Sequence, residues 1–313
     1  MHTSGIHHIT GITGDAQKNI DFYSGILGLR FVKLTVNFDD PSAYHLYYGN
    51  ASGEPGTALT FFAWPGIRKG VVGTGEITAI AFAVPLASLP FWKKHLATHA
   101  VPHEERERFG SAYIHLLDPD GLELELVPEE PLSRLVPWKS PFVKEEDAIR
   151  GFHAVTLTED GSELTRRFLA GGFGYTPEGE SGSVFRYVTA GNEPARYLYV
   201  RVAPDLQRGE MGAGTVHHVA FRAATDVDEL GMRTEMLSIG MDATPVIDCM
   251  YFHSVYFREP GGILFEIATD TPGFTVDESL ETLGSRLCLP PQYEPHRAEI
   301  TRQLPPLKLP AHD

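Results

Sequence analysis

The chain has 313 residues, with 26 lysines and arginines, 41 aspartates and glutamates, and a formal net charge of −15 at pH 7. This length predicts two domains with a core large enough to need no disulfide. We do not expect a nucleic-acid partner, because counterion release needs clustered cations and the chain has no run of Lys or Arg. The two cysteines, Cys249 and Cys288, cannot form a disulfide framework and favour a reducing, cytoplasmic location.

We expect neither a secretory signal nor a membrane partner. The N-terminal residues have neither the cationic nor the apolar region of a signal peptide. The most apolar stretch, residues 77–92, is interrupted by Pro85 and Pro90 and is too short to span a bilayer. The oligomeric state stays open, a homo-oligomer included.

The same order of signals recurs four times along the chain, which indicates an internal repeat. Each copy opens with a β-rich run, at residues 7–13, 78–84, 152–158 and 217–223. A helix follows each run, at residues 15–28 after an Asp15 cap, near 88–97, near 162–170, and at 228–240 after an Asp228 cap. Each copy closes with short strands, and the last strands fall at residues 56–62, 121–127, 197–203 and 261–269.

The repeat predicts an α+β fold of four βαβββ modules. One helix covers only one face of a four-stranded sheet, so each module needs a partner. We expect two cup-shaped domains, with modules 1 and 4 in one and modules 2 and 3 in the other. The expected modules span residues 5–65, 76–128, 151–204 and 215–270, with a proline-rich linker at 129–150 and a tail at 271–313. The tail is expected to wrap the surface or to be partly disordered near residues 304–313.

Modules 1 and 4 each open with a histidine pair, His7-His8 and His217-His218. A strand places neighbouring side chains on opposite faces, so we expect only one histidine of each pair to face a given cavity. The apolar residues of each strand share a face with the first histidine, and this face is expected to pack against the helix. His8 and His218 are therefore expected on the open face.

A carboxylate on the last strand of module 4 completes this pattern. Glu266 is flanked by four apolar residues, and an unpaired buried carboxylate is costly enough to require a cation. With His8 and His218 it makes a 2-His-1-carboxylate set, which leaves coordination positions of a divalent metal open. Glu266 is the fourth residue after Gly262. The fourth residue after the equivalent Gly56 of module 1 is Thr60, which is not a preferred metal ligand, so the fourth corner of the site is expected to stay open.

A second constellation lies in the middle modules. Glu125 is the fourth residue after Gly121, so it occupies the position of Glu266, and His153 aligns with His8 and His218. A second metal site is one reading. We expect instead a decayed duplicate in which His153 and Glu125 pair with each other, because the third corner is Ala79.

Two further residues are candidates for the cup, and one histidine is not. Tyr256 is expected to face it, where a phenol could bond a substrate oxygen or act as acid or base, although a simple wall residue is an equal alternative. Thr10 shares the face of His8 and could be a weak polar contact. His45 has no partner pattern, so we expect it to be solvated or to cap a turn.

These residues resemble the vicinal-oxygen-chelate superfamily of glyoxalases, bleomycin-resistance proteins and extradiol dioxygenases, and within it the hydroquinone-type ring-cleaving dioxygenases. The resemblance lies between residues 5 and 280, in GIHHITGITGDAQKNIDFYSGILGLRFVK, YHLYYGN, GEPGT, RGFHAVTL, VHHVAF, YFREPGGILFEIATD and PGFTVDE.

The resemblance implies an extradiol-type dioxygenase that cleaves a hydroquinone or catechol with dioxygen, in the degradation of aromatic compounds. It implies Fe(II), or less often Mn(II), held by His8, His218 and Glu266. It also implies that the residues lining or supporting the substrate site are His7, Thr10, His217 and Tyr256. Of these, His217 and Tyr256 are the expected acid–base or hydrogen-bonding groups.

The chain departs from the resemblance at one position, and two alternatives stay open. Hydroquinone-cleaving relatives often carry an arginine where this chain has DCMYFHS, residues 248–254, which favours an uncharged catechol or alkyl hydroquinone. A glyoxalase or isomerase would favour a fourth protein ligand at Thr60. A metal-free protein that sequesters an aromatic compound would leave Glu266 without a partner.

Overall fold

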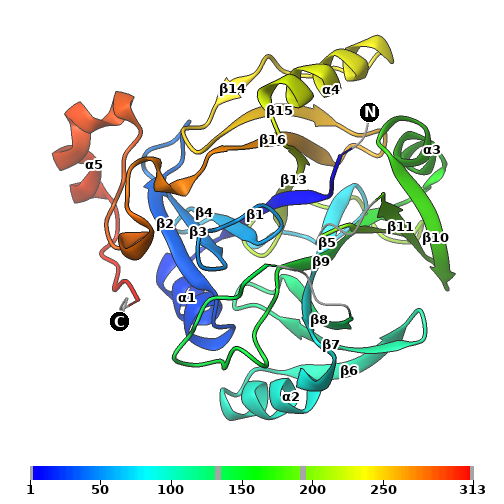
Figure 1. Ribbon diagram of the computed structural model, residues 1–313, viewed down its shortest axis with the longest axis horizontal. Coiled ribbons are helices and arrows are strands. Elements are labelled where there is room, and N and C mark those ends of the chain that lie inside the picture. The colour runs from blue at the N-terminus through cyan, green and yellow to red at the C-terminus, as the bar shows by residue number, and fades with distance from the viewer. Residues whose placement is uncertain (1–2, 131–134, 191–194, 311–313) are drawn as a thin grey trace.

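The computed structural model describes residues 3–130, 135–190 and 195–310 (Figure 1). These residues contain two eight-stranded sheets. The first has the strand order β14-β15-β16-β13-β1-β4-β3-β2, and the second has the order β10-β11-β12-β9-β5-β8-β7-β6. The strands of the first sheet are β1 (Ile6–Thr13), β2 (Arg30–Val36), β3 (Tyr44–Gly49), β4 (Ala58–Ala63), β13 (Val216–Ala223), β14 (Ile247–Asp248), β15 (Phe252–Arg258) and β16 (Leu264–Pro272). The strands of the second sheet are β5 (Glu76–Pro85), β6 (His103–Arg108), β7 (Ser111–Leu117), β8 (Glu123–Glu129), β9 (Phe152–Glu159), β10 (Tyr175–Ser181), β11 (Val184–Thr189) and β12 (Tyr197–Val202).

The strand order confirms the predicted fold class and the pairing of modules. β1 pairs antiparallel with β13, so modules 1 and 4 share a sheet, and β5 pairs antiparallel with β9, so modules 2 and 3 share the other. Within each module the first and last strands are parallel neighbours, as in β1 with β4 and β13 with β16. The exact bounds of modules, linker and tail stay predictions.

The helices lie at the periphery of the molecule in Figure 1. They are α1 (Ala16–Ile20), continued by a π-helical turn over Asp21–Ile26, α2 (Leu89–Thr98), α3 (Glu163–Gly172), α4 (Asp226–Ser238) and α5 (Arg297–Gln303). Asp15 caps α1 as predicted, because its carboxylate accepts the backbone N–H groups of Gln17 and Lys18. The predicted Asp228 cap of α4 is wrong: the extended residue Thr225 caps the helix, and Asp228 lies in its first turn.

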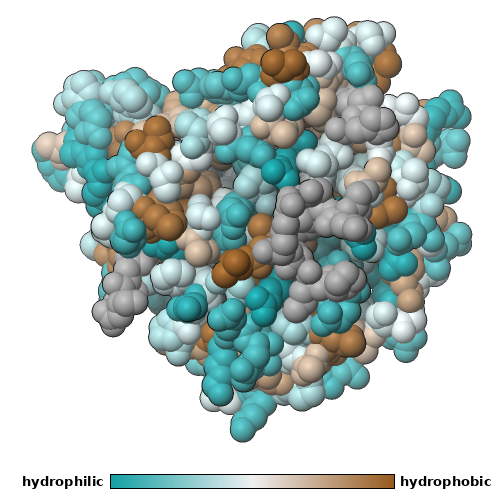
Figure 2. Space-filling view, in the orientation of Figure 1, coloured by the Kyte–Doolittle hydropathy of each residue, from teal (hydrophilic) through white to brown (hydrophobic). Residues whose placement is uncertain are grey.

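One hydrophobic cluster extends through both sheets and their helices, with Tyr23, Trp92 and Phe173 among its fully buried members. Hydrogen bonds between modules add to this packing. The Tyr23 hydroxyl donates to Asp118 of module 2, and the Thr165 hydroxyl donates to Glu259 of module 4. No helix of the described residues is long and apolar enough to cross a membrane. On the face in Figure 2, the hydrophobic residues among those described form small separate groups between hydrophilic ones.

The C-terminal segment runs over module 1. The hydroxyl of Tyr293 donates to the carbonyl of Phe38, and the hydroxyl of Tyr44 donates to the carbonyl of Pro305. Lys33 of β2 is fully buried, and its ammonium binds Asp277 and Glu278 of this segment. The segment therefore covers the outer strand of the first sheet. Of the region expected to be disordered, residues 311–313 lie outside the described residues.

Two buried carboxyl groups meet between modules 3 and 4. Glu159 ends β9, and Glu259 lies in the turn between β15 and β16, where it accepts the backbone N–H of Ile263. Glu159 is 1% exposed and Glu259 is 2% exposed. Burial raises the pKa of Glu159 to about 8, and the negative charge of Glu259 adds to the effect. Glu159 therefore folds as a neutral acid that hydrogen-bonds Glu259.

This pair predicts a loss of stability as the pH rises. The unfolded state releases the Glu159 proton near pH 4.5, but the folded state holds it to about pH 8, so the free energy of unfolding falls across that window. Glu159→Gln removes this titration. Its melting temperature should exceed that of the wild type by a margin that is small at pH 4.5 and grows toward pH 8. Thermal melts across this range, with the exposed Glu163→Gln as control, test it, and a margin independent of pH would contradict it.

Candidate active site

The first sheet encloses a cavity of about 470 Å³. Its lining comes from both modules, with side chains of β1, β3 and β4 on one side and of β13, β15 and β16 on the other. Phe62, Trp64, Phe252 and Leu264 give it apolar walls. A cavity of this size, mostly apolar with a few convergent polar groups, is typical of a site for a small molecule.

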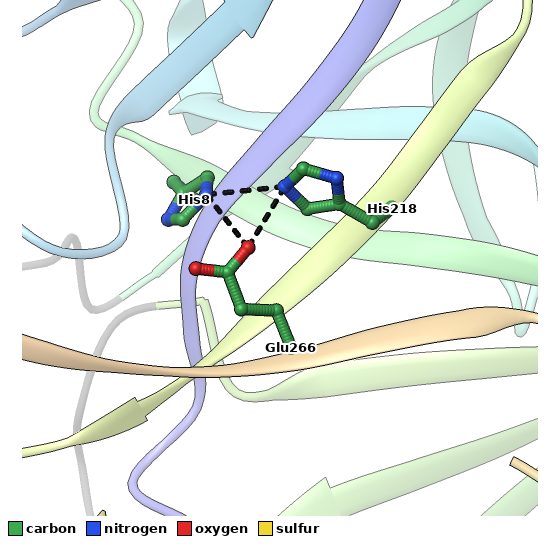
Figure 3. Close-up of side chains that lie close together, drawn as sticks. All are labelled: His8, His218 and Glu266. Atoms are coloured by element: carbon green, nitrogen blue, oxygen red, sulfur yellow. Dashed lines mark hydrogen bonds and ion pairs between the residues drawn. The ribbon is translucent and has the colours of Figure 1, made fainter. Parts of the chain in front are cut away.

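Three side chains converge beside this cavity, two of which line it, and Figure 3 shows how they point toward one another. They are His8 of β1, His218 of β13 and Glu266 of β16, and their ligand atoms all lie within 4.8 Å of one another. The Nε2 atoms of His8 and His218 are 3.3 Å apart. Oε2 of Glu266 lies 2.9 Å from Nε2 of His218 and 3.4 Å from Nε2 of His8. The structure thus brings together the three residues that the sequence predicts as a set.

Glu266 is fully buried, and its two oxygens have different surroundings. Oε1 accepts a hydrogen bond of 2.6 Å from the hydroxyl of Ser254, whereas Oε2 faces the two imidazoles and accepts no hydroxyl or backbone N–H of the described residues. Burial opposes the ionisation of Glu266, but the imidazoles of His8 and His218 outweigh it and hold its pKa well below the usual value. The cluster therefore contains an ionised carboxylate and two nitrogen donors.

Each histidine of the cluster also contacts its neighbour in the chain. Nδ1 of His8 lies 3.0 Å from Nδ1 of His7, and Nδ1 of His218 lies 2.8 Å from Nδ1 of His217. Burial lowers the pKa of His7 to about 3 and that of His217 to about 3, so both rings are neutral at neutral pH. In each pair, one Nδ1 must carry the proton and the other must accept it.

The expectation that only one histidine of each pair faces the cavity is wrong for module 4, because His217 and His218 both line it. The ladder between β1 and β13 shifts register at His217 and again at His7. An extra residue of this kind breaks the strict alternation of faces, so neighbouring side chains can turn to the same side. In module 1 the ring of His7 contacts His8 and the cavity residue Phe252.

The expectation that His45 is solvated or capping is also wrong. His45 lines the cavity, with Nε2 2.8 Å from the Thr60 hydroxyl and Nδ1 2.9 Å from the Tyr47 hydroxyl. Thr60 also bonds the hydroxyl of Thr10 at 2.8 Å. The alternation of faces along β3 could have predicted that His45 lies near Thr60, because His45 shares a face with Tyr47 and Tyr47 pairs with Thr60 across the ladder.

Tyr256 faces the cavity, as its alternation predicts. It pairs with Glu266 across the ladder, and its ring lies 5.6 Å from that of His218. Burial, together with the charge of Glu266, keeps the pKa of Tyr256 well above 10, so its hydroxyl stays protonated. Cys249 lines the same cavity, and burial raises the pKa of its thiol to about 12. Both groups are therefore uncharged at neutral pH.

The chain as a whole is similar to known proteins. Residues 5–126 match the family model of the Glyoxalase/Bleomycin resistance protein/Dioxygenase superfamily. The chain is 47% identical to "Putative ring-cleaving dioxygenase MhqO" of Bacillus subtilis over 307 residues, which cover 98% of this chain and 97% of the relative. This chain belongs to that superfamily. It is also 38% identical to "Chlorohydroquinone/hydroquinone 1,2-dioxygenase" of Sphingobium indicum over 311 residues, 96% of this chain and 95% of the relative.

Solved structures agree with this assignment. The crystal structure of a "putative dioxygenase" from Bacillus subtilis superposes with a TM-score of 0.95 at 47% identity, and the match covers 99% of both chains. Glyoxalase I from Zea mays superposes with a TM-score of 0.64 at 13% identity, over 85% of this chain and 92% of that one. At that identity the second likeness shows the fold alone. The resemblance predicted from the sequence is confirmed.

The second cup of this superfamily fold holds no equivalent cluster among the described residues, and the predicted pairing of His153 with Glu125 is wrong. Arg108 donates to both carboxylate oxygens of Glu125, at 3.0 Å for Nη1 and Oε1. His153 instead contacts the hydroxyl of Tyr199 at 2.8 Å and Glu129 at 3.0 Å. The guanidinium of Arg108 thus supplies the positive charge that Glu125 requires.

The register of the ladder explains why the alignment of His153 failed. β9 shifts against β5 at His153, as β1 shifts against β13 at His7. His153 therefore corresponds to His7, and Ala154 takes the place of His8. With Ala79 in the place of His218, this cup has no imidazole at either corner. A second metal site at Glu125 is not supported.

The ion pair between Arg108 and Glu125 in the second cup predicts a large loss of stability when Arg108 is replaced. The side chain of Arg108 is 12% exposed and that of Glu125 is 4% exposed. Arg108→Met leaves Glu125 buried without a cation, which should lower the free energy of unfolding by about 3–5 kcal/mol. The double variant Arg108→Met with Glu125→Leu should recover most of this loss. Urea unfolding measures both, with the exposed Arg167→Met as control, and a double variant as unstable as the single one would refute it.

Proposed function

We propose that this chain is a metal-dependent ring-cleaving dioxygenase that opens a hydroquinone or catechol with dioxygen. The observation that carries the proposal is Oε2 of Glu266, a buried carboxylate oxygen that faces the Nε2 atoms of two histidines. Two imidazoles and one carboxylate are the donor set of non-haem Fe(II) oxygenases. The names of the relatives, which include ring-cleaving and hydroquinone dioxygenases, support the same class of reaction.

The proposed ligands are His8, His218 and Glu266, and the proposed metal is Fe(II), with Mn(II) as the alternative. The site fits a divalent cation, since an ionised buried carboxylate faces two imidazole nitrogens and pairs with no Lys or Arg of the described residues. When bound, the metal would supply a redox-active Lewis acid with positions open toward the cavity.

His7 is proposed to position His8. As a metal ligand through Nε2, His8 carries its proton on Nδ1, which lies 3.0 Å from Nδ1 of His7. Nδ1 of His7 then accepts the Nδ1 proton of His8, and Nε2 of His8 keeps its lone pair toward Glu266. A partner of this kind, beyond the ligand itself, fixes the ring and its tautomer.

The remaining side chains would bind and orient the aromatic ring. Phe62, Trp64 and Phe252 offer apolar walls that exclude water from the ring. Tyr256 keeps its proton and is proposed to donate a hydrogen bond to a substrate oxygen. His217 is proposed as the second polar contact or acid–base group. Thr10 has the lesser role of a polar contact, since its hydroxyl is already bonded to Thr60.

Both alternative functions have an observation against them. A glyoxalase or isomerase would favour a protein ligand at the fourth corner, where the Thr60 hydroxyl is already bonded to Thr10 and His45. A metal-free binding protein would leave Oε2 of Glu266 without a cation. The dioxygenase needs an open side and therefore accounts for both features.

Removal of the carboxylate tests the function. Protein loaded anaerobically with Fe(II) should consume oxygen with a hydroquinone or catechol, and Glu266→Gln should lose both the bound metal and the oxygen uptake. An oxygen electrode and metal analysis measure these two quantities, and a hemithioacetal serves as the substrate for an isomerase. Metal-loaded protein that takes up no oxygen with any diol would favour the isomerase, and protein that binds no metal would favour a binding protein.

Replacement of His7 tests the positioning of His8. His7→Phe removes the acceptor of the Nδ1 proton and should weaken metal binding by about 10–100-fold. His153→Phe, at the equivalent position of the second cup, is the matched control and should leave the affinity unchanged. Competition with a chelator measures affinity independently of turnover. If His7→Phe and His153→Phe bound the metal with equal affinity, His7 would have no role in positioning His8.

A further inference from the structure

We propose that the cavity selects its substrates by charge, so that it accepts uncharged diols and rejects diols that carry a carboxylate. This inference rests on the proposed function and specifies its substrate class. It depends on two features of the cavity, the kinds of polar group along its wall and the acidic residues at its entrance.

The first feature is the lack of a fixed cation. No Lys or Arg is among the described residues that line the cavity, and the polar wall consists of imidazoles, hydroxyls, an amide, a thiol and two carboxylates. Within this lining the proposed metal would be the one strong positive charge, and the diol oxygens would occupy it. Arg208 and Arg258 line a separate pocket that adjoins the cavity at His217 and Leu264. A carboxylate on a ring held inside the cavity would therefore lose its hydration without an ion pair to the cavity wall, which is costly.

The second feature is a pair of aspartates at the entrance. Asp39 and Asp40 line the cavity on the loop between β2 and β3, and Asp39 is exposed to solvent. The Asp39 carboxylate has no ion pair or hydrogen bond within the described residues. Its negative charge is therefore not neutralised where a ligand enters.

Asp40 is held in place by two neighbours. Its carboxylate accepts hydrogen bonds from the hydroxyl of Ser42 at 2.5 Å and from Nε1 of Trp64 at 2.8 Å. Trp64 is itself a wall of the cavity, so the charge of Asp40 is fixed against that wall. Two like charges at the entrance repel an anionic ligand during its approach, and the acidic chain, with net charge −15, adds to this.

The experiment compares two substrates that differ in one group. Oxygen uptake by the Fe(II)-loaded protein gives kcat/KM for methylhydroquinone and for 2,5-dihydroxybenzoate. The wild type should prefer methylhydroquinone by about a hundredfold or more, because the carboxylate enters the cavity without a cation. Raising the salt concentration should narrow this preference, since salt screens the exposed charge of Asp39.

Reversal of the entrance charge tests the role of Asp39. Asp39→Arg should raise the ratio of kcat/KM for the acid to that for methylhydroquinone by about tenfold, and Asp39→Asn should raise it less. Asp205→Arg makes the same change at an exposed aspartate outside the cavity and should leave the ratio unchanged.

Two results would overturn the charge selection. One is a wild type that uses both compounds equally, and the other is a ratio that moves no more in Asp39→Arg than in Asp205→Arg. Lack of turnover with both compounds would count against the dioxygenase alone. In that case calorimetric titration of the metal-loaded protein with each compound still decides the selection, since equal binding of acid and neutral diol would refute it.

Discussion

The antiparallel ladder between β1 and β13 joins module 1 to module 4, and the candidate site depends on it. Through this ladder His8 and His218, which are 210 positions apart in the chain, come within 3.3 Å of each other. The parallel neighbour β16 then brings Glu266 opposite Ala220, beside both rings. Three central strands of one sheet therefore hold the cluster, and their shared backbone hydrogen bonds give it a rigid frame.

The two cups meet the same electrostatic requirement in different ways. Each has a buried glutamate at the equivalent strand position, Glu266 in one and Glu125 in the other. In the second cup Arg108 reaches Glu125 and lies between the rings of Tyr113 and Tyr199, at 4.8 and 4.3 Å. In the first cup the Glu266 carboxylate meets the Ser254 hydroxyl and the imidazoles of His8 and His218, and no Lys or Arg of the described residues pairs with it. The second cup thus neutralises its glutamate with an arginine of the chain, whereas the first contains a cluster of candidate metal ligands, His8, His218 and Glu266.

The surroundings of the site extend to the C-terminal segment. Asp277, which binds the buried ammonium of Lys33, also accepts a hydrogen bond of 3.1 Å from the hydroxyl of Tyr251. Tyr251 directly precedes Phe252, whose ring packs on His8 at 4.7 Å. A buried ion pair of the outer strand is thereby connected to the wall beside a proposed ligand.

The sequence by itself determined the repeat, the pairing of modules and the face on which His8, His218 and Glu266 lie, because alternation and the order of elements are local properties of the chain. The tertiary structure decided the register shifts at His7, His217 and His153, which depend on how two distant strands pair. It also decided the partners of Glu125 and His45, because Arg108 reaches Glu125 from β6, across the intervening strand β7, and Thr60 reaches His45 from the neighbouring strand β4. Local patterns predict which face a side chain takes, and only the packed sheet decides what it meets there.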